Sequence, residues 1–244
     1  MSQTIIYGKN PVVEAIKAGR KIHKIEIVGT EKGKFFEEVS GLAKENKIPL
    51  ETIDKKTLVK KVDTNEHQGV VAFVEPYNFV SVNEILEYAK GKSEQPLIII
   101  LDHVKDPQNL GGIIRTAEAV GAHGIIIPKD RAAGITPAVF KASSGALEHV
   151  KVAKVSNISR TINELQKKWI WVIGCESEGA ENYFDVKYDT PLTMVLGSEG
   201  EGLSNLVKKN CDFLVKIPMY GNVNSLNVST AGSIILYEIV KQRM

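Results

Sequence analysis

Two loops near the end of the sequence combine residue types that could bind a ligand and act on it. Residues 197–202 (GSEGEG) follow one short apolar run, and residues 217–227 (IPMYGNVNSLN) follow another. Glycine lets backbone amides approach a ligand closely, while Ser and Asn supply hydroxyl and amide groups with little bulk. Ordinary strand-to-helix turns use the same residues. Two such loops, one of them carrying Glu199, favour a site.

Five polar residues, some of them in these two loops, could carry the chemistry of that site. They are Asn109, Arg115, Glu199, Ser225 and Asn227. Asn109 is a residue type suited to cap the helix that contains Arg115. An arginine at the mouth of a cleft recognises phosphate or carboxylate well, although a surface salt bridge would explain Arg115 equally.

The elements that must position these residues form a repeating pattern from Leu97 onward. Residues 97–101 (LIIIL) read as a strand buried on both faces, and strands are also expected at 124–128, 150–155 and 170–174. Helices are expected from the 107–112 turn through Gly121, at 136–147, at 158–168 and at 226–241. The pattern predicts an α/β fold with a parallel sheet, in which ligands bind beyond the carboxyl ends of the strands.

The first 75 residues read as a separate small α/β unit. Helices are expected at 10–18, 35–46 and 55–61, with strands at 22–28, 48–53 and 67–74. Ser81 and Glu84 form a capping-box pattern that starts another helix. We therefore predict an N-terminal domain at 1–76, a linker with a short helix at 77–96, and a C-terminal domain at 97–244.

Composition limits the class of protein. The 244 residues are 43% hydrophobic and 25% charged, as in soluble globular proteins. No apolar run approaches the roughly 20 residues of a membrane span, and the N-terminus lacks the pattern of a signal peptide. Only Cys175 and Cys211 are present, and the five histidines are scattered, so we expect a cytoplasmic protein without a protein-bound metal.

The net charge of +2 arises in the N-terminal third. Residues 1–80 hold 13 Lys/Arg against 11 Asp/Glu, whereas residues 81–244 hold 18 of each. The excess lies in the clusters at 20–24 and 55–61. Such clusters are either solvated faces or contacts to phosphate groups.

Three common ligand-binding motifs are missing. The glycines near Asn109 and at 197–202 lack the Gly-x-Gly-x-x-Gly spacing of a dinucleotide site and its downstream acid. Neither a Gly-x-x-x-x-Gly-Lys-Ser/Thr phosphate loop nor a Gly-x-Ser-x-Gly nucleophile elbow occurs. These absences disfavour a small-molecule α/β enzyme.

Three segments in order resemble the motifs of the SpoU (TrmH-like) RNA ribose 2′-O-methyltransferases of the SPOUT superfamily. They are residues 106–111 (DPQNLG) with Arg115, residues 196–202 (LGSEGEG), and residues 217–219 (IPM) with 225–229 (SLNVS). Residues 7–12 (YGKNPV) and 67–70 (HQGV) are similar to the auxiliary RNA-binding domain of the RlmB subgroup, which methylates a guanosine in bacterial 23S rRNA.

The resemblance implies a C-terminal trefoil knot that holds S-adenosyl-L-methionine and a homodimer that pairs through the knotted region. The implied cofactor-binding residues are Leu196, Gly197, Gly200, Ile217, Met219 and Leu226. The close backbone approach allowed by Ser229, Ala231, Gly232 and Ser233 suits such a dimer, although core packing alone would explain the same residues.

The reaction implied by the resemblance is attack of a ribose 2′-hydroxyl on the methyl group of the cofactor, without a metal. In the family Arg115 would activate the hydroxyl, but arginine stays protonated near neutrality, so a phosphate clamp that aligns the nucleophile is physically easier. Asn109, Glu199, Ser225 and Asn227 would orient Arg115, the cofactor and the ribose. Contacts to RNA are expected from Lys9, Asn10, Arg20, Lys21, Lys24 and Arg115.

The function expected first is therefore methylation of a guanosine ribose in 23S rRNA. A tRNA ribose methyltransferase would use the same chemistry. A non-catalytic RNA-binding assembly factor with the same fold is a third reading, against which the complete set of five polar residues weighs.

Overall fold

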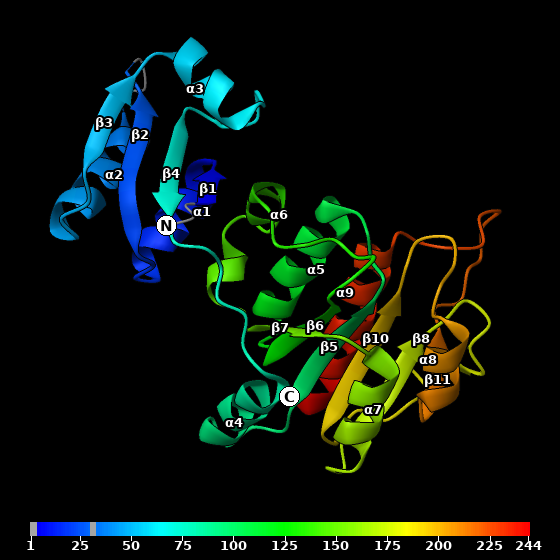
Figure 1. Cartoon of the computed structure of the whole chain (residues 1–244). Coiled ribbons are helices and arrows are strands. Elements are labelled where there is room, and N and C mark those ends of the chain that lie inside the picture. The colour runs from blue at the N-terminus through cyan, green and yellow to red at the C-terminus, as the bar shows by residue number, and fades with distance from the viewer. Residues whose placement is uncertain (1–3, 30–32) are drawn as a thin grey trace. The chain divides into compact units, whose positions relative to one another are not determined.

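The structure is a computed structural model that describes residues 4–29 and 33–244 (Figure 1). It contains two compact units. The first comprises the residues up to Asn78 together with Ile135–His149, and the second comprises Phe79–Gly134 and Val150–Met244. The α/β fold and the smaller N-terminal unit agree with the sequence-based prediction.

A four-stranded sheet forms the centre of the first unit, with strand order β1-β4-β2-β3. The strands are β1 (Thr4–Tyr7), β2 (Ile22–Val28), β3 (Leu50–Ile53) and β4 (Val70–Val74). The helices are α1 (Lys9–Lys17), α2 (Lys34–Glu45) and α3 (Lys55–Val62). The expected strand at 67–74 begins only at Val70, because Gln68 and Gly69 have positive φ angles of 52° and 82° and form a turn.

Residues 135–149 belong to this first unit although they lie far along the chain. They form α6 (Pro137–Ala142) and a short 3-10 helix (Ala146–Glu148) instead of one helix at 136–147. Ser144 and Gly145 have φ angles of 53° and 90°, which end the helix. Phe140 is fully buried, with the Arg20 guanidinium 4.6 Å from its ring centroid. The prediction that residues 97–244 form one continuous domain therefore differs from the observed division.

The second unit is built on a seven-stranded parallel sheet, ordered β7-β6-β5-β10-β8-β11-β9. The strands are β5 (Leu97–Asp102), β6 (Gly124–Pro128), β7 (Val152–Val155), β8 (Trp171–Cys175), β9 (Glu181–Asn182), β10 (Leu192–Gly197) and β11 (Phe213–Lys216). The helices are α4 (Val82–Gly91), α5 (Pro107–Ala119), α7 (Ile158–Gln166), α8 (Asn205–Asn210) and α9 (Val228–Arg243). Every residue of β5, β6 and β10 is buried, as their continuous apolar runs predict.

Small residues bring α5 and α9 close together. A Cβ atom on Gly112 would lie 3.2 Å from Ser229 Cβ, and the hydroxyls of Thr116 and Ser233 are 2.7 Å apart. A Cβ atom on Gly232 would lie 2.7 Å from Leu196 Cδ1. Packing within one chain thus uses the small residues of α9, and this packing brings the start of α9 beside the start of α5.

Candidate functional site

A cavity of about 590 Å³ lies at the carboxyl ends of β8, β10 and β11. This volume is in the range of small-molecule and cofactor sites. The loop after β10 and the loop between β11 and α9 form much of its wall. The structure brings together the six predicted cofactor-binding residues there, all of which line the cavity: Leu196, Gly197, Gly200, Ile217, Met219 and Leu226.

The loop after β10 folds back on itself as a tight turn. Ser198 N donates to Gly202 O at 3.1 Å, and Gly202 N donates to Ser198 O at 3.0 Å. A Cβ atom on Gly197 would lie 2.2 Å from the Gly202 carbonyl carbon. Gly200 and Gly202 have φ angles of 80° and 65°, a conformation that favours glycine. The glycines are therefore required by the close approach of two backbone segments at the cavity wall.

Three of the predicted catalytic residues form a hydrogen-bonded chain. Asn109 Nδ2 donates to Glu199 Oε1, and Asn227 Nδ2 donates to Asn109 Oδ1 at 2.8 Å. Asn227 also caps α9, since its Oδ1 accepts from Ser229 N at 2.9 Å. This chain links the loop after β10 with the first turns of α5 and α9.

Asn109 does not have the capping role that its residue type suggested. The N-cap of α5 is Asp106, whose side chain accepts from Gln108 N at 3.0 Å. Asn109 lies inside the first turn, so its amide is available to join Glu199 and Asn227.

Arg115 and Ser225 lie differently with respect to the cavity. Ser225 lines it, as do Glu199 and Asn227. Arg115 is exposed on α5 and is not among the lining residues. An arginine in this place can meet a large ligand that reaches the cavity from outside.

Two carboxylates at the ends of strands, one buried and one largely buried, are further parts of the site that the residue pattern did not predict. Asp102 ends β5, and its Oδ2 accepts from Ser204 N at 2.7 Å. Glu176 follows β8 and lines the cavity, and its Oε2 accepts from Leu203 N at 3.2 Å. Together they hold the end of the loop after β10. Their position directly after predicted apolar strands was the signal that could have identified them.

Neither cysteine has the environment of a nucleophile. Cys175 lines the cavity, but burial and the nearby Glu176 raise the pKa of its thiol to about 12. Burial and the nearby Asp212 raise the pKa of the Cys211 thiol to about 12 as well. Both thiols therefore stay protonated near neutrality.

Neither a metal-binding cluster nor a helix able to span a membrane occurs in the described ranges 4–29 and 33–244. No three His, Cys, Asp or Glu side chains gather there in a way that could hold a metal ion. Within the same ranges, no helix is both long and apolar enough to cross a membrane.

The basic cluster at 20–24 is largely engaged inside the first unit. Arg20 donates to Glu148 Oε1 at 2.6 Å and to Glu75 O at 2.7 Å, and its side chain is only 9% exposed. Its predicted role as a contact to RNA stays a prediction, with little of the side chain exposed for it. Lys21 is 71% exposed but lies 3.1 Å from a Glu75 carboxylate oxygen.

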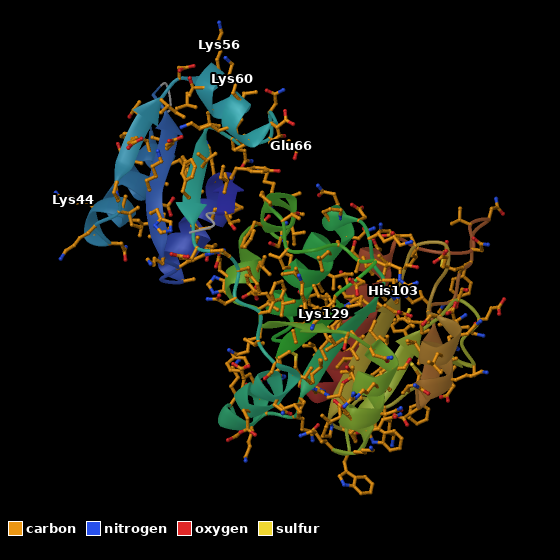
Figure 2. The ribbon with its side chains drawn as sticks, in the orientation of Figure 1. Lys44, Lys56, Lys60, Glu66, His103 and Lys129 are labelled. Carbon is orange, nitrogen blue, oxygen red and sulfur yellow. The ribbon has the colours of Figure 1, made fainter. Side chains whose placement is uncertain are left out.

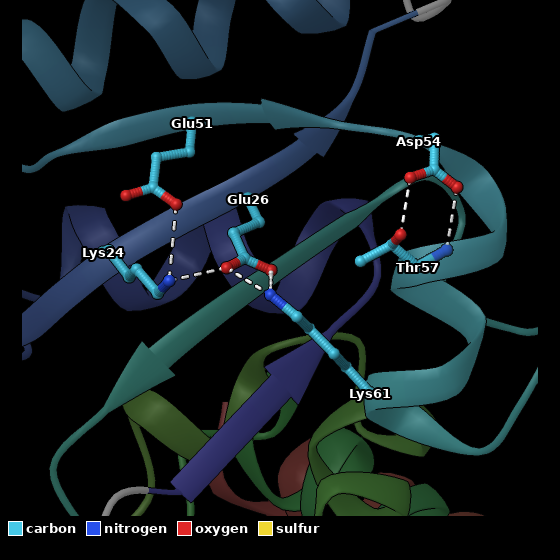
Figure 3. Close-up of polar contacts among 6 residues, drawn as sticks. All are labelled: Lys24, Glu26, Glu51, Asp54, Thr57 and Lys61. Atoms are coloured by element: carbon cyan, nitrogen blue, oxygen red, sulfur yellow. Dashed lines mark hydrogen bonds and ion pairs between the residues drawn. The ribbon is translucent and has the colours of Figure 1, made fainter.

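Lys24 belongs to a polar cluster around a buried carboxylate (Figure 3). Glu26 is fully buried, and its oxygens lie 2.6 Å from Lys24 Nζ and 2.7 Å from Lys61 Nζ. Burial opposes ionisation of Glu26, but hydrogen bonds from the two lysines outweigh it and lower the carboxyl pKa. Lys24 therefore stabilises a buried carboxylate of the sheet, besides any contact it makes at the surface.

The other predicted RNA contacts remain at the surface of the first unit. Lys9 lies 4.8 Å from the ring centroid of Phe35, and Asn10 is exposed. Lys56 and Lys60 project outward from α3, and Lys44 projects outward from α2 (Figure 2). The exposed positive charge of this unit thus lies on its helices more than in the 20–24 cluster.

Comparison with known proteins explains both units. Residues 96–237 match the SpoU rRNA Methylase family, and residues 5–80 match the family described as RNA 2′-O ribose methyltransferase substrate binding. A putative TrmH family tRNA/rRNA methyltransferase of Bacillus subtilis, YacO, is 45% identical over 239 residues, which cover 98% of this chain and 95% of that protein. A putative TrmH family tRNA/rRNA methyltransferase of Staphylococcus aureus is 43% identical over 243 residues, with 100% and 98% coverage.

Solved structures are similar to the whole chain or to a large part of it. The SpoU methyltransferase AviRb from Streptomyces viridochromogenes, in complex with the cofactor AdoMet, is similar with a TM-score of 0.83 and 27% identity, covering 99% of this chain and 90% of that one. A TrmH/SpoU tRNA modifying enzyme from A. aeolicus is 30% identical with a TM-score of 0.57, covering 66% and 83%. The fold and the matched families define an RNA methyltransferase with an added N-terminal domain. The chain belongs to the SpoU rRNA methylase family.

Proposed function

We propose that this protein transfers a methyl group from S-adenosyl-L-methionine to the ribose 2′-hydroxyl of a guanosine in 23S ribosomal RNA. The observation that carries the proposal is the cavity itself. Its wall contains the six predicted cofactor-binding residues, and the chain of Glu199, Asn109 and Asn227 joins that wall to α5, the helix of Arg115.

The residues of the cavity fit this cofactor. Leu196, Ile217, Met219 and Leu226 offer apolar surface for an adenine ring. Gly197 and Gly202 line the cavity, and a Cβ atom on either would meet the Gly202 backbone or the Glu176 carboxylate, so the tight turn at the cavity wall needs both glycines. Polar groups of Glu199, Ser225 and Asn227 lie in the same wall. S-adenosyl-L-methionine would supply an electrophilic methyl group there.

The chain's own residues would align the nucleophile. Arg115, exposed on α5, would hold a phosphate of the RNA so that the target hydroxyl faces the cavity. Asn109 and Asn227 fix the first turns of α5 and α9 relative to Glu199. Glu199 would accept a hydrogen bond from the ribose. Alignment of this kind can supply on the order of 7 kcal/mol of the barrier reduction.

The first unit would recognise RNA outside the reacting nucleotide. Its match to a substrate-binding family and the exposed Lys56 and Lys60 on α3 support this assignment. Lys9, Asn10 and Lys21 remain further contacts in the proposal. A folded RNA would be recognised there mainly through its shape and phosphates.

Three features implied by the family resemblance complete the proposal. The C-terminal part of the chain would form a trefoil knot, the protein would act as a homodimer through that part, and it would work in the cytoplasm. The location of β10 between β5 and β8, with α9 returning to pack against α5, is compatible with a knotted path.

The test uses methyl-labelled S-adenosyl-L-methionine and total RNA from cells that lack the protein. After reaction, the 23S, 16S and tRNA fractions are separated and digested to nucleosides. Label in 23S RNA as 2′-O-methylguanosine is the expected result.

The other outcomes separate the alternatives. Label in tRNA would keep the chemistry and replace the substrate, an alternative that the names of the relatives leave open. Absence of label in free RNA and in ribosomal precursors, with cofactor binding intact, would contradict the enzyme assignment and favour a non-catalytic RNA-binding factor.

A further inference from the structure

One largely buried carboxylate in the cavity wall has no part in the proposed reaction. Glu176 follows β8, and its side chain is only 10% exposed. It lines the same cavity as Leu196 and Met219. A buried carboxylate is costly unless its oxygens are paired, so the partners of each oxygen indicate what the residue can do.

The first oxygen of Glu176 is fully engaged by the protein. Oε2 accepts from Leu203 N at 3.2 Å and lies 2.8 Å from Lys208 Nζ of α8. The ion pair balances the charge, and the two contacts fix the direction of the carboxylate plane. Glu176 is therefore held rigidly in the wall.

The second oxygen retains hydrogen-bonding capacity. In the part of the chain that the structure describes, the one hydrogen-bonding neighbour of Oε1 is Ser177 Oγ, at the long distance of 3.5 Å. A Cβ atom on Gly202 would lie 2.9 Å from Oε1, so the oxygen lies against the loop after β10. A carboxylate oxygen can accept two hydrogen bonds, and Oε1 lacks a strong partner.

Three groups of S-adenosyl-L-methionine could donate to this oxygen: its ribose hydroxyls, the ammonium group of its methionine part and the 6-amino group of adenine. The apolar residues that suit adenine lie in the same wall, and the ribose is the group attached directly to adenine. Lys208 already balances the charge of the carboxylate, which favours neutral hydroxyl donors over a cationic ammonium. Acidic side chains bind ribose hydroxyls in the same way in dinucleotide-binding proteins.

We propose that Glu176 binds the ribose hydroxyls of the cofactor and makes the site selective for a ribonucleoside. This inference rests on the proposed use of S-adenosyl-L-methionine. It assigns a specificity-determining residue directly after β8, outside the three segments that carry the family resemblance.

The experiment measures binding to the full-length protein by calorimetry, without RNA. The ligands are S-adenosylhomocysteine and its 2′-deoxy and 3′-deoxy counterparts. The natural protein should bind at least one deoxy ligand about tenfold or more weaker, because the buried acceptor loses its donor. In Glu176→Ala that difference should shrink to about twofold or less, whereas the exposed neighbour variant Glu178→Gln should retain it.

The ratio of the affinities for S-adenosylhomocysteine and its deoxy counterparts distinguishes binding of the ribose by Glu176 from mere support of the loop after β10. If Glu176→Ala weakens all three ligands by one common factor, Glu176 only supports the loop and the proposal is wrong. Glu176→Gln preserves the size of the side chain and should still lose part of the ratio, which provides the test if the alanine variant does not fold. An unchanged ratio in Glu176→Gln that folds normally would overturn the proposal.

Two further results would also decide against it. Binding of 5′-methylthioadenosine, which lacks the amino acid part, tests the amino group as the alternative donor. If Glu176→Ala loses only the preference for S-adenosylhomocysteine over 5′-methylthioadenosine, the carboxylate binds the ammonium group. If the natural protein binds none of these ligands, the cofactor assignment itself fails, and the inference fails with it.

Discussion

At the scale of single residues, the hydrogen-bonded chain of Glu199, Asn109 and Asn227 has a different function from Arg115. These residues fix the walls around the cavity, while Arg115 lies on the exposed side of α5 and does not line it. Binding of the cofactor and handling of the RNA should therefore depend on different side chains.

Arg115→Ala should abolish methyl transfer while leaving cofactor binding intact. Loss of one preorganised charged contact costs about 10²- to 10³-fold in turnover. Turnover is measured with labelled cofactor, and affinity for S-adenosylhomocysteine by calorimetry. Arg115→Lys should recover only part of the rate, because lysine cannot form the same two-pronged contact with phosphate. Loss of cofactor binding in Arg115→Ala would show that its role has been assigned wrongly.

Glu26 leads to a prediction about pH. Lys24 and Lys61 lower its carboxyl pKa in the folded protein despite burial, so its contribution is present above the ordinary pKa of 4.5 and is lost as pH falls through the folded value. Glu26→Gln should cost about 1–3 kcal/mol near neutrality and much less at pH 3.5. Hydrogen exchange of the Ile25 and Ile27 amides measures this locally. An equal cost at both pH values would contradict the prediction.

At the scale of elements, much of the architecture could be predicted from residue patterns. Continuous apolar runs such as 97–101 identified the buried parallel strands, and Ser81 with Glu84 identified the start of α4, where both hydrogen bonds of the capping box are present. Strand β1, at the start of the described chain, was not predicted. The end of α6 was missed because a residue without special propensity, Ser144, adopts a positive φ angle.

The site, like the fold, could be predicted only in part from the sequence. The glycine- and amide-rich loops have a local signature, and the cofactor-binding residues expected from them do line one cavity. Glu176 and Asp102 have only a positional signal, at the ends of predicted apolar strands. Their importance depends on contacts with Leu203 and Ser204, which are distant in sequence. Local pattern cannot reveal a partner that only the folded sheet brings near.

The loop after β10 leads to a prediction with a matched control. Gly197→Ala would place a Cβ atom 2.2 Å from the Gly202 backbone, so the turn must move and the cavity wall with it. We expect affinity for S-adenosylhomocysteine to fall about tenfold or more. Gly221→Ala meets no atom within 4 Å and should leave affinity unchanged. Equal affinities of the two variants would show that the turn does not shape the site.

At the scale of the whole molecule, the first unit is assembled from two separated stretches of chain. The contacts of Arg20 with Phe140 and Glu148, and of Glu14 with His149 at 2.9 Å, join the N-terminal residues to Ile135–His149. The cavity residues all lie in the second unit. Cofactor binding and the integrity of the 135–149 segment should therefore respond differently to truncation.

Deletion of residues 1–78 should preserve binding of S-adenosylhomocysteine but reduce affinity for RNA. It should also expose Val139 and Phe140, which are fully buried in the complete chain, and make residues 135–149 sensitive to protease. The same truncation with Val139→Ser and Phe140→Ser is the control, since it should restore solubility without restoring affinity for RNA. Full RNA affinity in either truncated protein would contradict the role given to the first unit.

Charge reversal tests which face of the first unit meets RNA. Lys56→Glu with Lys60→Glu should weaken RNA binding and make it less dependent on salt, because phosphate contacts release bound counterions. Lys44→Glu, on α2, is the matched control and should have little effect. Affinities are measured at several salt concentrations. A larger effect of Lys44→Glu would place the RNA on the other helix.

The division of the first unit between two stretches of chain also determines the order in which the protein can mature during synthesis. The residues that fold around Phe140 lie more than 60 positions before it, and β5, α5 and β6 are made in between. The N-terminal domain is thus the first to leave the ribosome but cannot be completed until His149 has emerged. Until then, the surfaces of α1 and Arg20 that residues 135–149 cover in the complete protein stay exposed to solvent. A nascent chain stalled before residue 135 should therefore depend on chaperones far more than one stalled after residue 149.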